Sequence, residues 1–130
     1  MPRVSHYTEH PDVILVDETA LAALLDELYG SQGTIIRFVA DFVHDLPERC
    51  KQIRHACERH DCERVAELAL SIRTSAQMIG AHRLARDAAM LQATANADDC
   101  DCEPYVRVLE ATAAETMPHL ISIGYRVRTA

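Results

Sequence analysis

Glycine and proline are scarce in this chain, at four and five of its 130 residues. Alanine, leucine, glutamate and arginine are abundant instead, and all four favour helices. The length suits one domain with a buried core. Hydrophobic residues make up 48% of the chain and charged residues 25%, an ordinary globular balance. The composition therefore predicts a single, mainly helical domain.

Long apolar runs are also absent. No stretch approaches the roughly 20 apolar residues that span a bilayer. The polar residues before Val13 do not form the apolar core of a signal peptide. We therefore expect no membrane association and a cytoplasmic location. The net charge of -7 and the lack of a basic run argue against nucleic acid as a partner.

Motifs for catalysis are missing too. The sequence has no glycine-rich phosphate loop, no nucleophile elbow and no HExxH zinc motif. The paired carboxylates of Asp98 and Asp99 stand in a polar loop without an apolar setting that would tune them. We expect a protein that is not an enzyme and that holds no cofactor.

Apolar residues recur at three- and four-residue spacing along most of the chain, which is typical of amphipathic helices. Asp17 is a suitable N-cap, and Gly30 and Gly80 are placed to end helices. Pro47 and Pro118 are expected to kink or break the helices that contain them. The predicted helices cover residues 17–29, 31–60, 62–79, 81–95 and about 104–125.

Short connections between long helices imply antiparallel neighbours. The expected fold is all-α: an up-down four-helix bundle over residues 13–125, with an additional N-terminal helix covering one end or side. Residues 1–12 are expected to be flexible, and residues 126–130 are expected to fray. Nothing in the sequence indicates a second domain.

The stretch at residues 64–84 organises the rest of the chain. At about 100° per residue, its main apolar side chains fall within roughly 40° of one another, which is ordinary core patterning. Leu70 lies about 140° away from them, on the polar side of the same helix. The apolar stripe consists of Val65, Leu68, Ile72, Ala76 and Ile79, and the polar side carries Glu63, Glu67, Thr74 and Gln77.

This stretch resembles the signature helix of histidine-containing phosphotransfer (HPt) domains. The residues that match the family pattern in order are Ile72, Arg73, Thr74, Ser75, Ala76, Ile79, Gly80 and Ala81. The following segment HRLARDAAMLQ is similar to the family's next helix, and the likeness extends over residues 17–123. The resemblance implies a four-helix bundle that belongs to two-component phosphorelay signalling.

The chain departs from the family pattern at its reactive position. Leu70 stands where the family carries the phosphorylated histidine, and Thr74 replaces a glycine that lets a receiver domain approach closely. A leucine has no nitrogen that can accept a phosphoryl group, whereas Arg73 keeps a cation beside the position.

The resemblance therefore implies a degenerate member, a non-phosphorylatable adaptor or inhibitor. It would bind the receiver domain of a response regulator, or a hybrid sensor kinase, as a monomer or weak dimer. The implied binding residues are Leu70, Arg73, Thr74, Glu67 and Gln77.

Two other functions stay open. An active relay protein could use another histidine, and the candidates are His44, His55, His60 and His82. None of them is surrounded by the residues that match the family pattern. Alternatively, the chain could be a metal- or redox-responsive helical module.

An up-down bundle brings two loops to one end, and these loops carry His60, Cys62, Cys100 and Cys102. Thiolate and imidazole together suit zinc, but Cys-x-Cys is not the usual spacing of a structural zinc site. A solvated loop with no metal and five reduced thiols is the preferred prediction. A disulfide between the two loops is the alternative.

Overall fold

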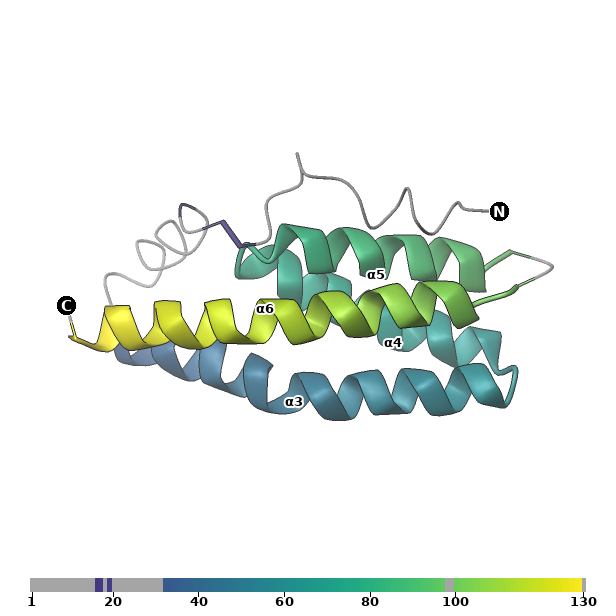
Figure 1. Cartoon of the computed structure of the whole chain (residues 1–130), viewed down its shortest axis with the longest axis horizontal. Coiled ribbons are helices and arrows are strands. Elements are labelled where there is room, and N and C mark those ends of the chain that lie inside the picture. Colours follow the sequence, from purple (N-terminus) through teal and green to yellow (C-terminus); the bar gives the residue numbers. More distant parts are fainter. Residues whose placement is uncertain (1–15, 18, 20–31, 98–99, 130) are drawn as a thin grey trace.

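The computed structural model describes residues 16–17, 19, 32–97 and 100–129 of the chain. The described part contains four long helices and no strand, which confirms the all-α prediction (Figure 1). The helices are α3 (Gln32–Glu58), α4 (Cys62–Met78), α5 (His82–Ala95) and α6 (Glu103–Thr129).

The four helices pack as an up-down bundle. Each helix runs opposite to the one before it, and α6 returns to lie beside α3 (Figure 1). Close packing joins α3 with α4, α4 with α5, α5 with α6, and α3 with α6. Both the α3–α4 and the α5–α6 connections therefore lie at one end of the bundle (Figure 1).

One continuous hydrophobic core fills the space between the helices. Its largest fully buried apolar side chains come from all four helices: Leu46, Ile53, Val65, Ile72, Ile79, Leu84, Leu91, Val106, Leu109 and Leu120. The α4 residues among them lie on the predicted stripe, because residues three and four apart share one helix face.

Two polar side chains inside the core connect α5 with α6. Asp87 is 3% exposed, and the Thr112 hydroxyl donates to its Oδ2 across 2.5 Å. The Thr116 hydroxyl is also buried, and it donates to the Thr112 carbonyl at 2.6 Å. Burying a carboxylate is costly without hydrogen bonds, so these contacts fix how the two helices meet.

The helices end at tight, hydrogen-bonded turns. At the end of α4, Gly80 has a φ of 81°, and its N–H donates to Gln77 O while Ala81 N–H donates to Ala76 O. This is the Schellman pattern that glycine favours. His60 takes the same place after α3, with a φ of 57°. The three-residue connection 59–61 follows from that turn.

Both interior prolines are accommodated without ending a helix. Pro47 lies within α3 and Pro118 within α6, so neither proline breaks its helix. Both prolines are exposed, so the carbonyl that each leaves without a helical donor can bond water.

Little of the two chain ends bears on the predictions of an N-terminal helix and a frayed C-terminal tail. Most of the expected N-terminal helix at 17–29, and the flexible segment 1–12, lie outside the described residues. Asp17 accepts a hydrogen bond from Thr19 N at 2.9 Å, as an N-cap does, and its own N–H donates to Gly80 O at 2.6 Å. At the other end, α6 extends to Thr129, into the segment 126–130 for which fraying stays a prediction.

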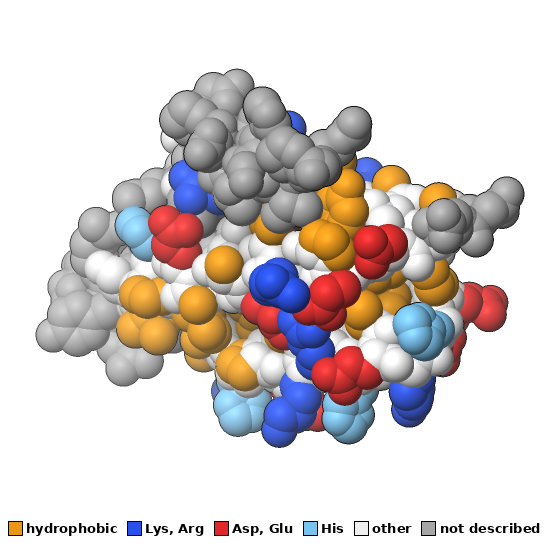
Figure 2. Space-filling view, turned by 45° about the vertical axis from the view of Figure 1, so that its right-hand side comes forward, with side chains coloured by type: hydrophobic (Ala, Val, Ile, Leu, Met, Phe, Trp, Pro, Cys, Tyr) orange, Lys and Arg blue, Asp and Glu red, His pale blue; other side chains and the backbone are white. Residues whose placement is uncertain are grey.

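An ion-pair network joins α3 to α6. The Arg54 guanidinium donates to both carboxylate oxygens of Glu110, at 2.7 and 3.1 Å, and to Glu103 at 2.5 Å. The hydrogen bonds from Arg54 and Arg107 lower the pKa of Glu103. Acidic and basic side chains also lie close together on the face shown in Figure 2. The net charge of -7 therefore does not give this face a uniform negative field.

We expect Arg54→Met to lower the free energy of unfolding by about 1 kcal/mol, since the pair is bidentate but partly exposed. Methionine keeps an apolar stem of similar length, so the change isolates the charge. Urea unfolding at pH 7 measures the effect. Arg107→Met is the matched control, because Arg107 bonds Glu103 within α6 and is 73% exposed. Equal losses in the two variants would contradict a special role for Arg54.

No helix in the described part of the chain is both long and apolar enough to cross a membrane.

Candidate functional site

The outward side of α4 carries most of the predicted binding residues. We call Glu67, Leu70, Thr74 and Gln77 the Leu70 face; all four are exposed. Leu70 is 45% exposed, whereas Ile72, two residues further on, is fully buried. The helical period thus separates a core position from a surface position, as the sequence predicted.

The polar members of the Leu70 face make local contacts. The Thr74 hydroxyl donates to the Leu70 carbonyl at 3.0 Å, one helical turn back. Glu67 accepts from Arg64 at 3.2 Å, also within α4. The Thr74 hydroxyl bonds the main chain of Leu70, and the Leu70 side chain stays exposed to solvent.

The predicted cation does not stand in the open. Arg73 is half-buried, and its guanidinium donates to Gln92 of α5 at 3.1 Å. On the opposite flank, Arg49 of α3 donates to the Ser71 hydroxyl at 3.2 Å. The two arginines therefore border the Leu70 face. Arg73 links α4 to α5, and Arg49 links α3 to α4.

Met78 is a second exposed apolar side chain on α4, and the sequence reasoning missed it. It is 51% exposed. It stands two turns after Leu70 at about 80° around the helix, with Thr74 between them. The sequence could have revealed the exposure of Met78, because this residue lies outside the apolar stripe that ends at Ile79.

The Leu70 face carries neither a histidine nor a cysteine. Helix α4 contains no histidine or cysteine after its first residue, and the Thr74 hydroxyl is engaged by a carbonyl. A nucleophile needs a neighbouring base to activate it. The histidines lie elsewhere: His44 and His55 are exposed on α3, His60 forms the α3–α4 turn, and the His82 ring lies 3.1 Å from Asp17.

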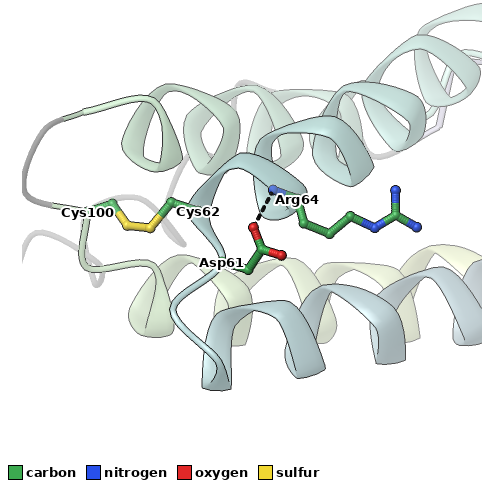
Figure 3. Close-up of a disulfide and its surroundings, with 4 residues drawn as sticks. All are labelled: Asp61, Cys62, Arg64 and Cys100. Carbon is green, nitrogen blue, oxygen red and sulfur yellow. Dashed lines mark hydrogen bonds between the residues drawn. A yellow bond between two sulfur atoms is a disulfide. The ribbon is translucent and has the colours of Figure 1, made fainter.

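A second cluster lies at the end of the bundle where the two loops meet. Cys62, at the start of α4, forms a disulfide with Cys100, which precedes α6 (Figure 3). The prediction of five reduced cysteines is therefore wrong, and the alternative disulfide between the loops is present. The physical reason is the up-down topology, which brings residues 38 positions apart to one end of the bundle.

The remaining thiols hold their protons. Burial raises the pKa of the Cys50 thiol to about 11, and the Glu110 carboxylate raises it further. Burial likewise raises the pKa of Cys102 to about 11, helped by Cys57 and Asp101. The pKa of Cys57 is also raised, first by desolvation and then by Glu103. Because the thiolate is the nucleophile, the raised pKa values lower the reactivity of these three thiols at neutral pH.

The predicted metal-ligand set is only partly brought together. The sulfur atoms of Cys62, Cys100 and Cys102 lie within 4.8 Å of one another. His60 lines the adjoining cavity of about 260 Å³, but its ring is not part of that close group. The backbone explains this, since His60 closes the turn after α3.

No protein-family model matches this chain, and neither a curated protein nor a solved structure matches it.

Proposed function

We propose that this chain is a non-phosphorylatable signalling adaptor that binds a receiver domain through the Leu70 face. The proposal starts from the HPt resemblance of residues 17–123. Such a protein would sequester or scaffold the receiver domain of a response regulator or hybrid sensor kinase. Receiver partners of this kind would place its work in the cytoplasm.

The observation that carries the proposal is the exposure of Leu70. Its side chain is 45% exposed and lies among the polar side chains of Glu67, Thr74 and Gln77. Interfaces commonly place an apolar anchor at the centre of a polar rim, and such anchors supply much of the binding energy. Leu70 also occupies the position that, by the resemblance, faces the partner.

The surroundings of Leu70 suit an interface. Thr74 and Gln77 offer polar groups beside the anchor, and Met78 extends the apolar area. Arg73 and Arg49 are each held by a neighbouring helix, so the surface is ordered before it binds. A preorganised surface loses less entropy on binding.

The absence of a phosphoacceptor defines the effect. A receiver that docks on Leu70 meets no side chain that can take or return its phosphoryl group. The complex would therefore hold the receiver without dephosphorylating it. This distinguishes the proposed adaptor from a relay protein with the same fold.

Binding to receiver domains from the same organism tests the proposal. We expect at least one receiver to bind the purified chain one to one, with a Kd on the order of 1 µM. Biolayer interferometry, with and without beryllofluoride on the receiver, measures the affinity. Binding by none of them would refute the proposal.

Phosphoryl transfer gives an independent outcome. We expect no label on the chain after incubation with a ³²P-labelled receiver. An acid-labile phosphohistidine on the chain would instead show a working relay that uses another histidine.

A further inference from the structure

The cluster of Cys62, Cys100 and Cys102 is not used by the Leu70 face. Among the described residues, it is the group in which three metal-binding side chains converge within 4.8 Å. In a tetrahedral zinc–thiolate site, Zn–S bonds of about 2.3 Å place the sulfur atoms about 3.8 Å apart. Cys102 lies within 4.8 Å of both bonded sulfur atoms, so reduction of the disulfide leaves three thiols in one small volume, as the ligands of a shared zinc ion must be.

Hydrogen bonds at the helix starts hold the backbone near two of these cysteines, Cys62 and Cys102. Cys62 is the first residue of α4, directly after Asp61, whose carboxylate accepts from Arg64 N at 3.2 Å (Figure 3). Cys102 is 5% exposed, and its carbonyl accepts from Val106 N at 2.8 Å in the first turn of α6. Cys100 belongs to the connection that meets them. A metal would thus join α4 and α6 at the end of the bundle where the two loops meet.

The surroundings favour a cation. The cavity of about 260 Å³ beside the sulfur atoms is lined by four carboxylate side chains: Glu58, Asp61, Asp101 and Glu103. A cleft lined by side chains of one charge attracts counter-ions, so these carboxylates favour the entry of a divalent cation. Cys57 lines the same cavity and offers a fourth sulfur.

We propose that the reduced chain binds one zinc ion through the thiolates of Cys62, Cys100 and Cys102. Cys57 or a solvent molecule takes the fourth position. Soft thiolate ligands in a four-coordinate, tetrahedral arrangement select zinc, whereas magnesium and calcium prefer oxygen ligands. The inference does not depend on receiver binding, because the cluster lies at the end of α4 opposite to Met78.

The disulfide and the metal site are alternative states of the same sulfur atoms. A dithiol reductant supplies two electrons and two protons, which break the Cys62–Cys100 bond and leave two thiols, and the dithiol becomes a disulfide. Zinc then displaces the protons of the three thiols. In the reverse step a small-molecule disulfide takes up the two electrons and becomes two thiols, the Cys62–Cys100 bond forms again, and the zinc ion is released.

Metal content and cobalt spectroscopy test the site. The chain is purified in reducing buffer without added metal, and zinc is measured by mass spectrometry before and after oxidation. We expect about one zinc per reduced chain and none per oxidised chain. The reduced, metal-free chain should take up one Co²⁺, with a sulfur-to-cobalt charge-transfer band and the visible bands of tetrahedral cobalt.

Cys102→Ser separates the metal site from the disulfide, because Cys102 is a free thiol. We expect this variant to keep the Cys62–Cys100 disulfide when oxidised and to lose zinc affinity by on the order of 100-fold when reduced. Cys50→Ser is the matched control, since Cys50 is a partly buried free thiol outside the cluster. Circular dichroism checks that each variant folds.

Three results would overturn the proposal. The first is a reduced wild-type chain that takes up neither zinc nor Co²⁺ at equimolar concentration. The second is unchanged affinity in a folded Cys102→Ser variant. The third is an equal loss in Cys50→Ser, which would place the metal elsewhere.

Discussion

Leu70→Asp is expected to weaken receiver binding by about 30-fold or more, equivalent to about 2 kcal/mol. The substitution puts a hydrated charge where the partner would cover an apolar side chain, and it adds to the negative charge of Glu67 one turn away. Because Leu70 is exposed and lies outside the hydrophobic core, the substitution is expected to leave the fold intact. Titration of the receiver by isothermal calorimetry measures the change.

Two controls keep this result interpretable. Leu70→Gln removes the apolar group without adding charge, and it should also weaken binding. Ile121→Asp makes the same chemical change on α6, at a side chain that is 58% exposed. Helix α6 lies across the bundle from α4, so this variant should bind as the wild type does. Unchanged binding by Leu70→Asp would remove the Leu70 face as the interface.

Light scattering adds a check on self-association. A chain that paired with its own copy through Leu70 would be dimeric as wild type and monomeric as Leu70→Asp. The adaptor proposal expects a monomer for both at the concentrations of the binding assay.

Ile72→Ala is expected to lower the free energy of unfolding by about 2–5 kcal/mol. Ile72 is fully buried among residues of the core, so its truncation removes apolar contacts and leaves a cavity. A loss of that size is a large fraction of the stability of a small domain. Urea denaturation followed by circular dichroism measures it.

Leu70→Ala is the matched control for this core substitution. It removes a similar number of atoms two residues away on the same helix, from a side chain in solvent. Its effect should stay within about 0.5 kcal/mol. If the two substitutions destabilised the chain equally, the division of α4 into a core side and a solvent-exposed side would be wrong.

Local signals in the sequence were enough for most of the fold. The spacing of apolar residues placed α4 and α5 to within a residue of their observed bounds, because helical period and capping act over a few neighbouring residues. Gly80 is found at the end of α4, as expected, and Asp61 caps its start. The exposure of Leu70 followed from the same period.

Contacts between helices could not be read from local signals. The sequence placed Arg73 as a cation beside Leu70, whereas the packed helices tie its guanidinium to Gln92 of α5. The Asp87–Thr112 hydrogen bond likewise depends on where α5 meets α6. Pairings of this kind depend on helix rotation and side-chain reach, which periodicity does not specify.

The sequence by itself determined an all-helical chain with Leu70 on the outside of its central helix, because amphipathic period and turn residues are local properties. Only the tertiary structure decided the state of the cysteines. Topology brought Cys62, Cys100 and Cys102 to one end of the bundle, where Cys62 and Cys100 form the disulfide. Closeness across 38 residues depends on how the helices return past one another.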